Sequence, residues 1–380
     1  MTTPAPIQAV YLHVPFCRTL CGYCDFYSIV PAQCQISPLV DALIRELDQY
    51  ASRHELAVAT IFVGGGTPTT LPPAELRRLL ARLRELPRGD VPLEFSVEAN
   101  PATVTPEIAA VLAAEGVNRV SVGAQSFNHA ELRVLERTHQ PPQVAQTLAA
   151  CRKAGLSRFS LDLIFAIPGQ TLDSWLANLA AAITLDPGHL SCYSLTYEPG
   201  TRLHDQVQAG AVTPVDPDLD ADMYEQTIDT LAAAGYEQYE ISNFARPGAE
   251  CRHNLAYWHN LPYLGIGPSA AGLVDGVRYK NIADVDEYTR GVLAGVSPRA
   301  EEERRTTEQR ARETAMLELR LRAGINRAAF AERYGSDPVD FFAETVDRNV
   351  ARGLIEVNET HVRLTRRGLL LGDTVMAEFL

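Results

Sequence analysis

Residues 11–26 read YLHVPFCRTLCGYCDF, and three cysteines fall within eight positions of this stretch. Cys17, Cys21 and Cys24 have the spacing C-x3-C-x2-C and follow the apolar run 9–14, which predicts a buried strand. A loop that leaves a strand end can wrap an inorganic cluster, because its backbone is free of ladder hydrogen bonds. Thiolates are the soft ligands that iron–sulfur clusters take. The spacing therefore predicts a [4Fe–4S] cluster held by these three cysteines, with one iron left open.

Two other interpretations compete with the cluster. Zinc sites usually show two separated C-x2-C pairs, and no second pair occurs in the sequence. Unrelated buried thiols are also common, since a free cysteine packs like a small hydrophobic residue. A chance grouping of three is rare, however, when the chain has only seven cysteines.

The composition is that of a folded protein with a sizeable core. The 380 residues are 46% hydrophobic and 21% charged, and the length suggests two or three domains or one large domain with an appendage. The net charge of −13 argues against nucleic acid as the main partner. The sequence shows neither a run of eighteen apolar residues nor a secretory leader, and few cysteines suggest a reducing compartment. We therefore expect a cytoplasmic protein.

Short apolar segments alternate with helical patterns along the first two thirds of the chain. After residues 9–14, strands are predicted at 60–63, 93–97, 119–122, 159–163 and 190–195, and helices at 38–52, 73–85, 106–115, 142–154, 172–184 and 218–234. Six strand-then-helix units predict an α/β fold, a partial (β/α)6 barrel with a parallel sheet. In such barrels the active site gathers at the carboxyl ends of the strands.

Unusual residues do follow the predicted strands. The second strand runs into GGGTPT at residues 64–69, the third ends at Glu98, the fourth at Gln125, and the fifth carries Asp162. A glycine run with proline is often only a turn, and an acid after a strand often only caps a helix. Their common position predicts instead a ligand site on one rim of the barrel.

These stretches carry a family resemblance. CRTLCGYC, GGGTPT, SVEANP, RVSVGAQSFN, LERTHQ and SLDLIFAIPGQT resemble successive motifs of the radical S-adenosylmethionine (SAM) group around oxygen-independent coproporphyrinogen III oxidase. The resemblance implies that SAM binds the open iron. It places Tyr11 near the cluster, Gly65, Gly66 and Thr67 at the SAM amino group, and Glu98, Gln125, Arg137 and Asp162 at its ribose, carboxylate and neighbouring groups. Tyr23 and Phe26 of the cysteine loop complete the expected cofactor-binding set.

The segment 236–272 holds a second motif. Residues 253–258, HNLAYW, match HNxxYW, which resembles a signature of the HemW haem chaperones within this group. An imidazole beside aromatic rings is what haem capture needs, so His253 is the expected haem determinant. Three alternatives stay open: His259 as the haem ligand, a second zinc site with Cys251, and a histidine that only satisfies the packed interior.

Beyond residue 300 the pattern changes. Residues 301–322 predict an arginine-rich helix, 327–334 and 338–352 two further helices, and 354–357 with 361–364 a hairpin before a last helix capped by Thr365. This order predicts a winged-helix-like domain. Residues 301–380 contain fifteen acids, thirteen arginines and no lysine, so no basic footprint for DNA is present. The expected domains are thus 1–240 (barrel), 241–299 (closing segment) and 300–380.

Two functions follow from the resemblance. One is radical SAM decarboxylation of coproporphyrinogen III, and the other is binding of haem and its transfer to acceptor proteins, with membrane-associated respiratory proteins among the candidates. The oxidases of this group carry a further cysteine where this chain has Phe26, have a longer N-terminal extension, and lack HNxxYW. All three differences favour the chaperone. Whether SAM is cleaved stays open.

Overall fold

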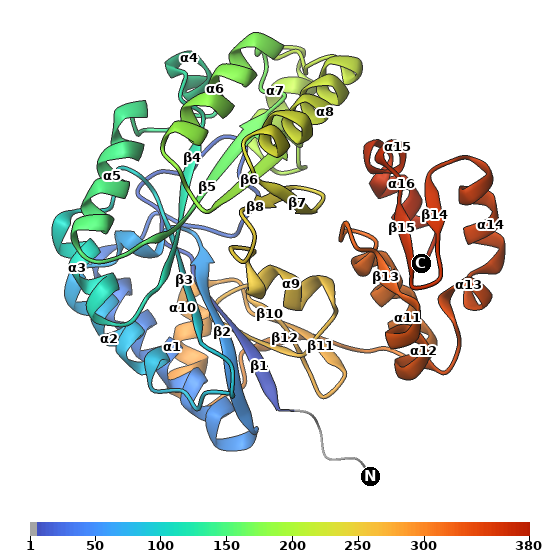
Figure 1. Cartoon of the computed structure of the whole chain (residues 1–380). Helices are drawn as coiled ribbons and strands as arrows, with labels where there is room; N and C mark the ends of the chain where they lie inside the picture. The colour runs from blue at the N-terminus through green and yellow to red at the C-terminus, as the bar shows by residue number, and fades with distance from the viewer. Residues whose placement is uncertain (1–5) are drawn as a thin grey trace.

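The computed structural model describes residues 6–380 and shows a curved sheet covered by helices, with a separate helical unit at the C-terminal end (Figure 1). Residues 1–5, part of the segment in which we expect no secretory leader, lie outside the described residues. The large sheet has the order β12-β11-β10-β9-β1-β2-β3-β4-β5-β6-β8-β7. Its central strands are β1 (Ile7–Val14), β2 (Leu56–Gly65), β3 (Glu94–Ala99), β4 (Arg119–Gln125), β5 (Arg158–Phe165) and β6 (His189–Ser194).

Each neighbouring pair from β1 to β6 is parallel, which confirms the predicted partial (β/α)6 barrel. The covering helices are α1 (Gln33–Arg53), α2 (Pro73–Arg84), α3 (Pro106–Ala114), α4 (His129–Val134), α5 (Pro141–Lys153), α6 (Leu172–Thr184), α7 (Arg202–Gln208) and α8 (Pro217–Ala233), with the short 3-10 helix η1 (Pro68–Thr70) after β2. In α1, the i, i+4 series Leu39, Leu43 and Leu47 is fully buried against the sheet. This apolar face is what fixes the helix on the barrel.

A second set of elements extends the sheet at both edges, because β9 pairs with β1 and β8 pairs with β6. It comprises β7 (Glu237–Glu240), β8 (Asn243–Ala245), α9 (Arg252–Trp258), β9 (Tyr263–Ile266), β10 (Ala271–Val274), β11 (Val277–Asn281), α10 (Val285–Leu293) and β12 (Arg299–Arg304). Strand β9 lies parallel to β1, so residues 267–270, which follow β9, reach the same rim as the cysteine loop. The Gly267 amide is held there by the buried carboxylate of Glu46, which accepts its hydrogen bond at 2.8 Å.

The predicted helix over 301–322 is wrong at its start. Residues 299–304 form β12, which pairs antiparallel with β11, and the helix α11 (Thr307–Glu318) begins only after Thr306. Pairing with β11, which is separated from β12 in the sequence by α10, outweighs the helix preference of the glutamate and arginine residues.

The C-terminal unit contains α11, β13 (Ile325–Asn326), α12 (Arg327–Tyr334), α13 (Pro338–Phe341), α14 (Ala343–Ala351), β14 (Ile355–Val357), β15 (His361–Leu364), α15 (Arg366–Leu370) and α16 (Gly372–Ala377). The order β13-β15-β14 and the helices around it confirm the helical unit with a small hairpin. Thr365 accepts the hydrogen bond of the Gly368 amide and caps α15 as predicted, whereas the helix expected over 338–352 is divided at Phe342. No helix within residues 6–380 is long and apolar enough to cross a membrane.

Candidate functional site

The cysteine loop and the GGGTPT loop lie against each other at the carboxyl end of β1 and β2. The amide of Gly66 donates to the carbonyl of Val14 at 2.9 Å, and the amide of Thr67 donates to the carbonyl of Phe16 at 2.7 Å. A Cβ on Gly66 would lie 2.8 Å from the Val14 carbonyl oxygen, so only glycine allows this approach. The Thr67 hydroxyl also reaches the Cys17 sulfur at 3.5 Å. The two motifs therefore form one continuous surface.

The three cysteines of the loop are free thiols that are partly exposed at this surface. Burial raises the pKa of Cys17, and it raises the pKa of Cys24 to about 12. Arg137 donates from Nη1 to the Cys21 sulfur at 3.5 Å, which places a fixed positive charge beside the set. Three soft donors beside a cation fit an anionic iron–sulfur cluster, whose binding would release the thiol protons. Within residues 6–380, no three His, Cys, Asp or Glu side chains converge on a single-ion site.

Two carboxyl groups lie beside this surface, on the interior face of the barrel. Glu98 Oε2 accepts a hydrogen bond from the Gly65 amide at 3.0 Å. Burial, followed by the nearby Asp162 carboxylate, raises the pKa of Glu98 to about 8. Burial also raises the pKa of Asp162, although Ser121 donates to it at 3.1 Å. Two crowded acids of this kind are stabilised by a cationic ligand, such as the sulfonium or ammonium group of SAM.

Gln125 and Arg137 complete the predicted rim. Gln125 has a φ of 61°, a left-handed conformation that is uncommon for a residue with a side chain and that occurs often at ligand sites. Arg137 donates from Nη2 to the Gly123 carbonyl at 2.7 Å, while its buried Nε has no hydrogen-bond partner in the described part of the chain. An unsatisfied guanidinium nitrogen at this edge fits a carboxylate such as that of SAM.

The remaining predicted cofactor residues, Tyr11, Tyr23 and Phe26, lie in three different surroundings. Tyr11 points into the barrel and its hydroxyl lies 2.9 Å from Nδ1 of His13, a buried histidine that sequence reasoning missed. Tyr23 packs on an apolar cluster with Leu135, while Phe26 is 66% exposed. Phe26 therefore contributes little enclosed surface to the rim, and the position where related oxidases carry a cysteine faces solvent.

His253 does not face solvent. It lies on α9 with its side chain fully buried, its Nδ1 is 2.9 Å from the Thr60 hydroxyl, and its Nε2 is 2.9 Å from the Tyr257 hydroxyl. Burial, with a smaller contribution from the charge of Arg119, lowers the pKa of His253 to about 3. The ring is therefore neutral at physiological pH, and both of its nitrogens are occupied by partners.

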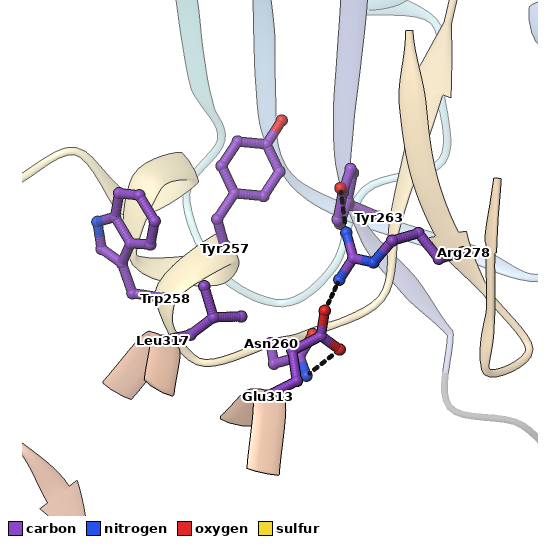
Figure 2. Close-up of a pocket in the computed structure, with 7 residues that line it drawn as sticks. All are labelled: Tyr257, Trp258, Asn260, Tyr263, Arg278, Glu313 and Leu317. Carbon is purple, nitrogen blue, oxygen red and sulfur yellow. Dashed lines mark hydrogen bonds and ion pairs between the residues drawn. The ribbon is translucent and has the colours of Figure 1, made fainter. Parts of the chain in front are cut away.

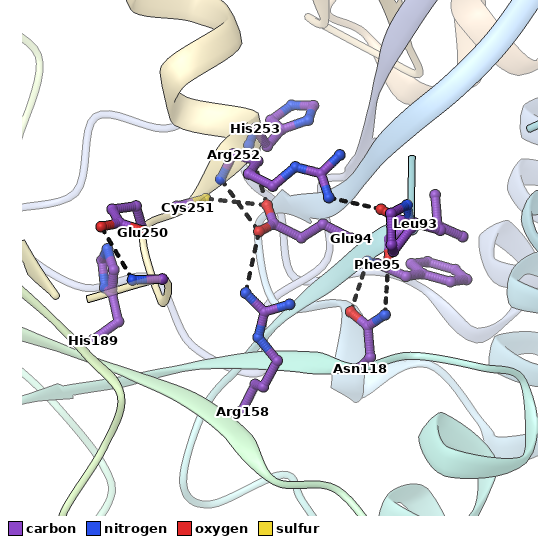
Figure 3. Close-up of polar contacts among 12 residues, drawn as sticks. Leu93, Glu94, Phe95, Asn118, Arg158, His189, Glu250, Cys251, Arg252 and His253 are labelled. Atoms are coloured by element: carbon purple, nitrogen blue, oxygen red, sulfur yellow. Dashed lines mark hydrogen bonds and ion pairs between the residues drawn. The ribbon is translucent and has the colours of Figure 1, made fainter. Parts of the chain in front are cut away.

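Glu94, on β3, fixes the start of α9 and was not predicted (Figure 3). Its fully buried carboxylate accepts hydrogen bonds from the backbone amides of Arg252 at 3.2 Å and His253 at 3.1 Å. Cys251 lies at the N-cap of α9 without a capping side-chain hydrogen bond of its own, and its thiol donates to Glu94 at 3.7 Å. Because Glu94 replaces the missing cap, the barrel sheet itself determines where α9 begins.

The other end of α9 borders a cavity of about 230 Å³ between the barrel and the C-terminal unit (Figure 2). It is lined by Tyr257, Trp258, Asn260, Tyr263, Arg278, Glu313 and Leu317. Arg278 donates to Glu313 at 2.8 Å, and Asn260 donates to the same carboxylate at 3.2 Å, so the two units are joined at the cavity wall. The half-exposed His259 lies at the C-cap of α9 and its Nδ1 is 3.2 Å from Glu318.

A partial barrel with three cysteines after its first strand and a glycine-rich loop after its second defines a radical SAM protein. The description "Radical SAM superfamily" matches residues 11–181, and "HemN C-terminal domain" matches residues 306–371. Among solved structures, the Escherichia coli coproporphyrinogen III oxidase HemN, described as a radical SAM enzyme, has a TM-score of 0.84 and 26% identity. That similarity covers 98% of this chain and 90% of HemN.

Curated relatives define the family more narrowly. Heme chaperone HemW of Bacillus subtilis (strain 168) is 36% identical, covering 98% of this chain and 99% of the relative. Heme chaperone HemW of Escherichia coli (strain K12) is 35% identical, covering 99% and 98% respectively. This chain belongs to the HemW family.

Proposed function

We propose that this protein is a haem chaperone, which binds haem, transfers it to acceptor proteins, and carries a [4Fe–4S] cluster and SAM at the barrel rim. The observation that carries the proposal is the HNxxYW helix α9, which Glu94 fixes with His253 and Tyr257 turned toward the barrel interior. The names of the relatives, heme chaperone HemW, support the same function. The acceptors are proteins in this proposal, not nucleic acids.

Each cofactor has residues that suit it. Cys17, Cys21 and Cys24 would hold the cluster, and the rim from Gly65 to Asp162 described above would hold SAM. When bound, the cluster supplies a redox centre next to SAM. The proposal does not require SAM cleavage, because holding and releasing haem needs no radical.

Haem binding at α9 requires a local rearrangement. His253 is neutral, so no proton competes with iron, but the Tyr257 hydroxyl occupies Nε2. Iron would ligate His253 only after Tyr257 moves aside. The cavity of about 230 Å³ next to Tyr257 is smaller than typical cofactor pockets, so haem cannot enter it whole without such a movement.

The test is a haem titration followed by the Soret band, on wild type, His253→Ala, His259→Ala, the double variant His253→Ala/His259→Ala, and Tyr257→Phe. We expect His253→Ala to lose binding and Tyr257→Phe to bind at least as tightly as wild type, since Nε2 is released. Loss only in His259→Ala would move the iron ligand to the end of α9. Full binding in the double histidine variant would contradict the assignment of the site.

The alternative is oxygen-independent coproporphyrinogen III oxidase, and the similarity to HemN over 98% of the chain favours it. The exposed Phe26 at the position of the additional cysteine in the oxidases argues against it. Consumption of coproporphyrinogen III by the reconstituted protein would show that it is an oxidase.

A further inference from the structure

A buried arginine on the inner wall of the barrel has no direct partner for part of its guanidinium group. Arg119 opens β4 and is 3% exposed, and its Nη2 has no hydrogen-bond partner among residues 6–380. Val120 and Val122, which alternate with it, pack in the apolar core, so Arg119 and Ser121 face the barrel interior. Burying a charged group without direct hydrogen bonds costs free energy, so the free Nη2 of Arg119 needs an explanation, and a bound ligand would provide one.

The acids near Arg119 are engaged elsewhere. Burial acts to lower the pKa of Arg119, but the nearby Cys251, Glu94, Tyr239 and Asp162 raise it, so the guanidinium stays charged. The Glu94 carboxylate, however, accepts from the amides of α9, and Arg158 lies 3.7 Å from it. Asp162 accepts from Ser121 at 3.1 Å and from Ser160 at 3.3 Å. Neither acid therefore uses up the hydrogen-bonding capacity of Arg119.

A second unsatisfied donor lies next to the first. Ser96 is fully buried, and its hydroxyl has no hydrogen-bond partner in the described part of the chain. Ser96 on β3 is the register partner of Arg119 on β4, so the two side chains are neighbours on one face of the sheet. A guanidinium and a hydroxyl side by side match the two oxygens of a carboxylate.

Aromatic rings line an adjacent part of the same interior. Phe62 stacks on His253 with ring centroids 5.3 Å apart and on Tyr11 at 6.4 Å. Tyr257 contacts His253 edge-on at 4.8 Å. The barrel thus combines flat apolar surfaces with a donor pair at its floor, which suits a planar aromatic ligand that carries a carboxylate.

We propose that Arg119 and Ser96 form a carboxylate-binding subsite at the floor of the barrel, which takes a propionate group of haem. The identity of the ligand rests on the proposed function, whereas the subsite itself rests on the two unsatisfied donors. In this proposal Arg119 binds a ligand and does not stabilise the ligand-free fold. Replacing Arg119 should therefore change the melting temperature of the ligand-free protein little.

The experiment compares protoporphyrin IX, which lacks iron, with its dimethyl ester, whose propionates are masked. Binding is followed by fluorescence for wild type, Arg119→Gln, Arg119→Lys, Ser96→Ala and the surface control Arg246→Gln, and each variant is also melted without ligand. We expect wild type to bind the free acid at least about tenfold more tightly than the ester, as for one charge-assisted hydrogen bond. Arg119→Gln should lose this preference, Arg119→Lys and Ser96→Ala should keep part of it, and the control should keep all of it.

Two results would overturn the subsite. One is an unchanged preference for the free acid in Arg119→Gln, which would place the propionates elsewhere. The other is a large drop in the melting temperature of ligand-free Arg119→Gln, which would make Arg119 a structural countercharge to Glu94 and Asp162. Failure of wild type to bind haem would contradict the proposed function alone. Binding of protoporphyrin IX would then test the subsite. The subsite would be rejected if that binding did not depend on Arg119.

Discussion

The carboxylate of Glu94 accepts a hydrogen bond from the backbone amide of His253 at 3.1 Å, although the two residues are 159 positions apart in the sequence. This bond connects the base of β3 to the first turn of α9, which carries His253, Tyr257 and Trp258. The position of the candidate haem residues is therefore set by the barrel and not by the short helix itself.

Replacing Glu94 tests this relationship. Glu94→Ala should lower the free energy of unfolding by about 1–3 kcal/mol, because buried amides of α9 lose their acceptor, and it should weaken haem binding. Glu94→Gln keeps one acceptor oxygen and should recover part of both losses. The measurements are denaturant unfolding and a haem titration, with Glu115→Gln as a control, since Glu115 is a buried glutamate paired with Arg77 and Arg84 outside the barrel interior. Equal haem binding in wild type and Glu94→Ala would show that α9 needs no support from β3.

We predict that three thiols of the protein, those of the cysteine loop, hold the iron–sulfur cluster. Alanine at Cys17, Cys21 or Cys24 should abolish the absorbance of the reconstituted iron–sulfur cluster. Alanine at Cys251 should leave it intact, because that thiol is buried against Glu94 at the base of α9. A requirement for Cys251 equal to that for the loop cysteines would disprove a cluster with three protein ligands.

Arg137 should contribute to SAM affinity. Arg137→Ala in a protein that retains its cluster should bind SAM more weakly by about 1.5–3 kcal/mol, as expected for one charge-assisted hydrogen bond. Arg133→Ala, an exposed arginine on the neighbouring α4, is the matched control. Isothermal titration of both variants measures the difference, and unchanged affinity in Arg137→Ala would remove this residue from the site.

Glu98 should make stability depend on pH. Its pKa is about 8 in the folded protein, above the value of an unfolded glutamate, so the folded state holds an extra proton between these two values. Stability should therefore fall as pH rises from about 5 to 8, by at most about 1.4 kcal/mol per pH unit, and level off above pH 8. Melting of ligand-free wild type and Glu98→Gln across this range isolates the contribution, since glutamine cannot ionise. Parallel curves for the two proteins would contradict the raised pKa.

The sequence predicted the parts of this fold that depend on local pattern. The helix over residues 172–184 and the six parallel strands follow from apolar periodicity, which the packing of each helix on the sheet enforces. Strand β12 was mistaken for helix because its pairing with β11 is visible only in three dimensions. Strands β7 to β11 were missed for a related reason, since short strands of three to five residues carry too little periodicity to be distinguished.

The residues of the candidate site were likewise predicted only in part from the sequence. Motif spacing indicated the cysteines and the rim residues, and the structure brings the GGGTPT loop onto the cysteine loop. Glu94 and Arg119 were not indicated, because one acid or one arginine at a strand start resembles any surface charge. Only the folded barrel shows that both are buried beneath α9.

The most direct test of the chaperone function is a parallel assay on anaerobically reconstituted protein with an intact cluster. One half is titrated with haem and then mixed with an apo-haemoprotein to measure transfer, and the other half is supplied with coproporphyrinogen III, SAM and reductant. We predict stoichiometric haem binding that depends on His253, transfer to the acceptor, and no decarboxylated product. Robust decarboxylation without haem binding would contradict the account and identify the protein as an oxidase.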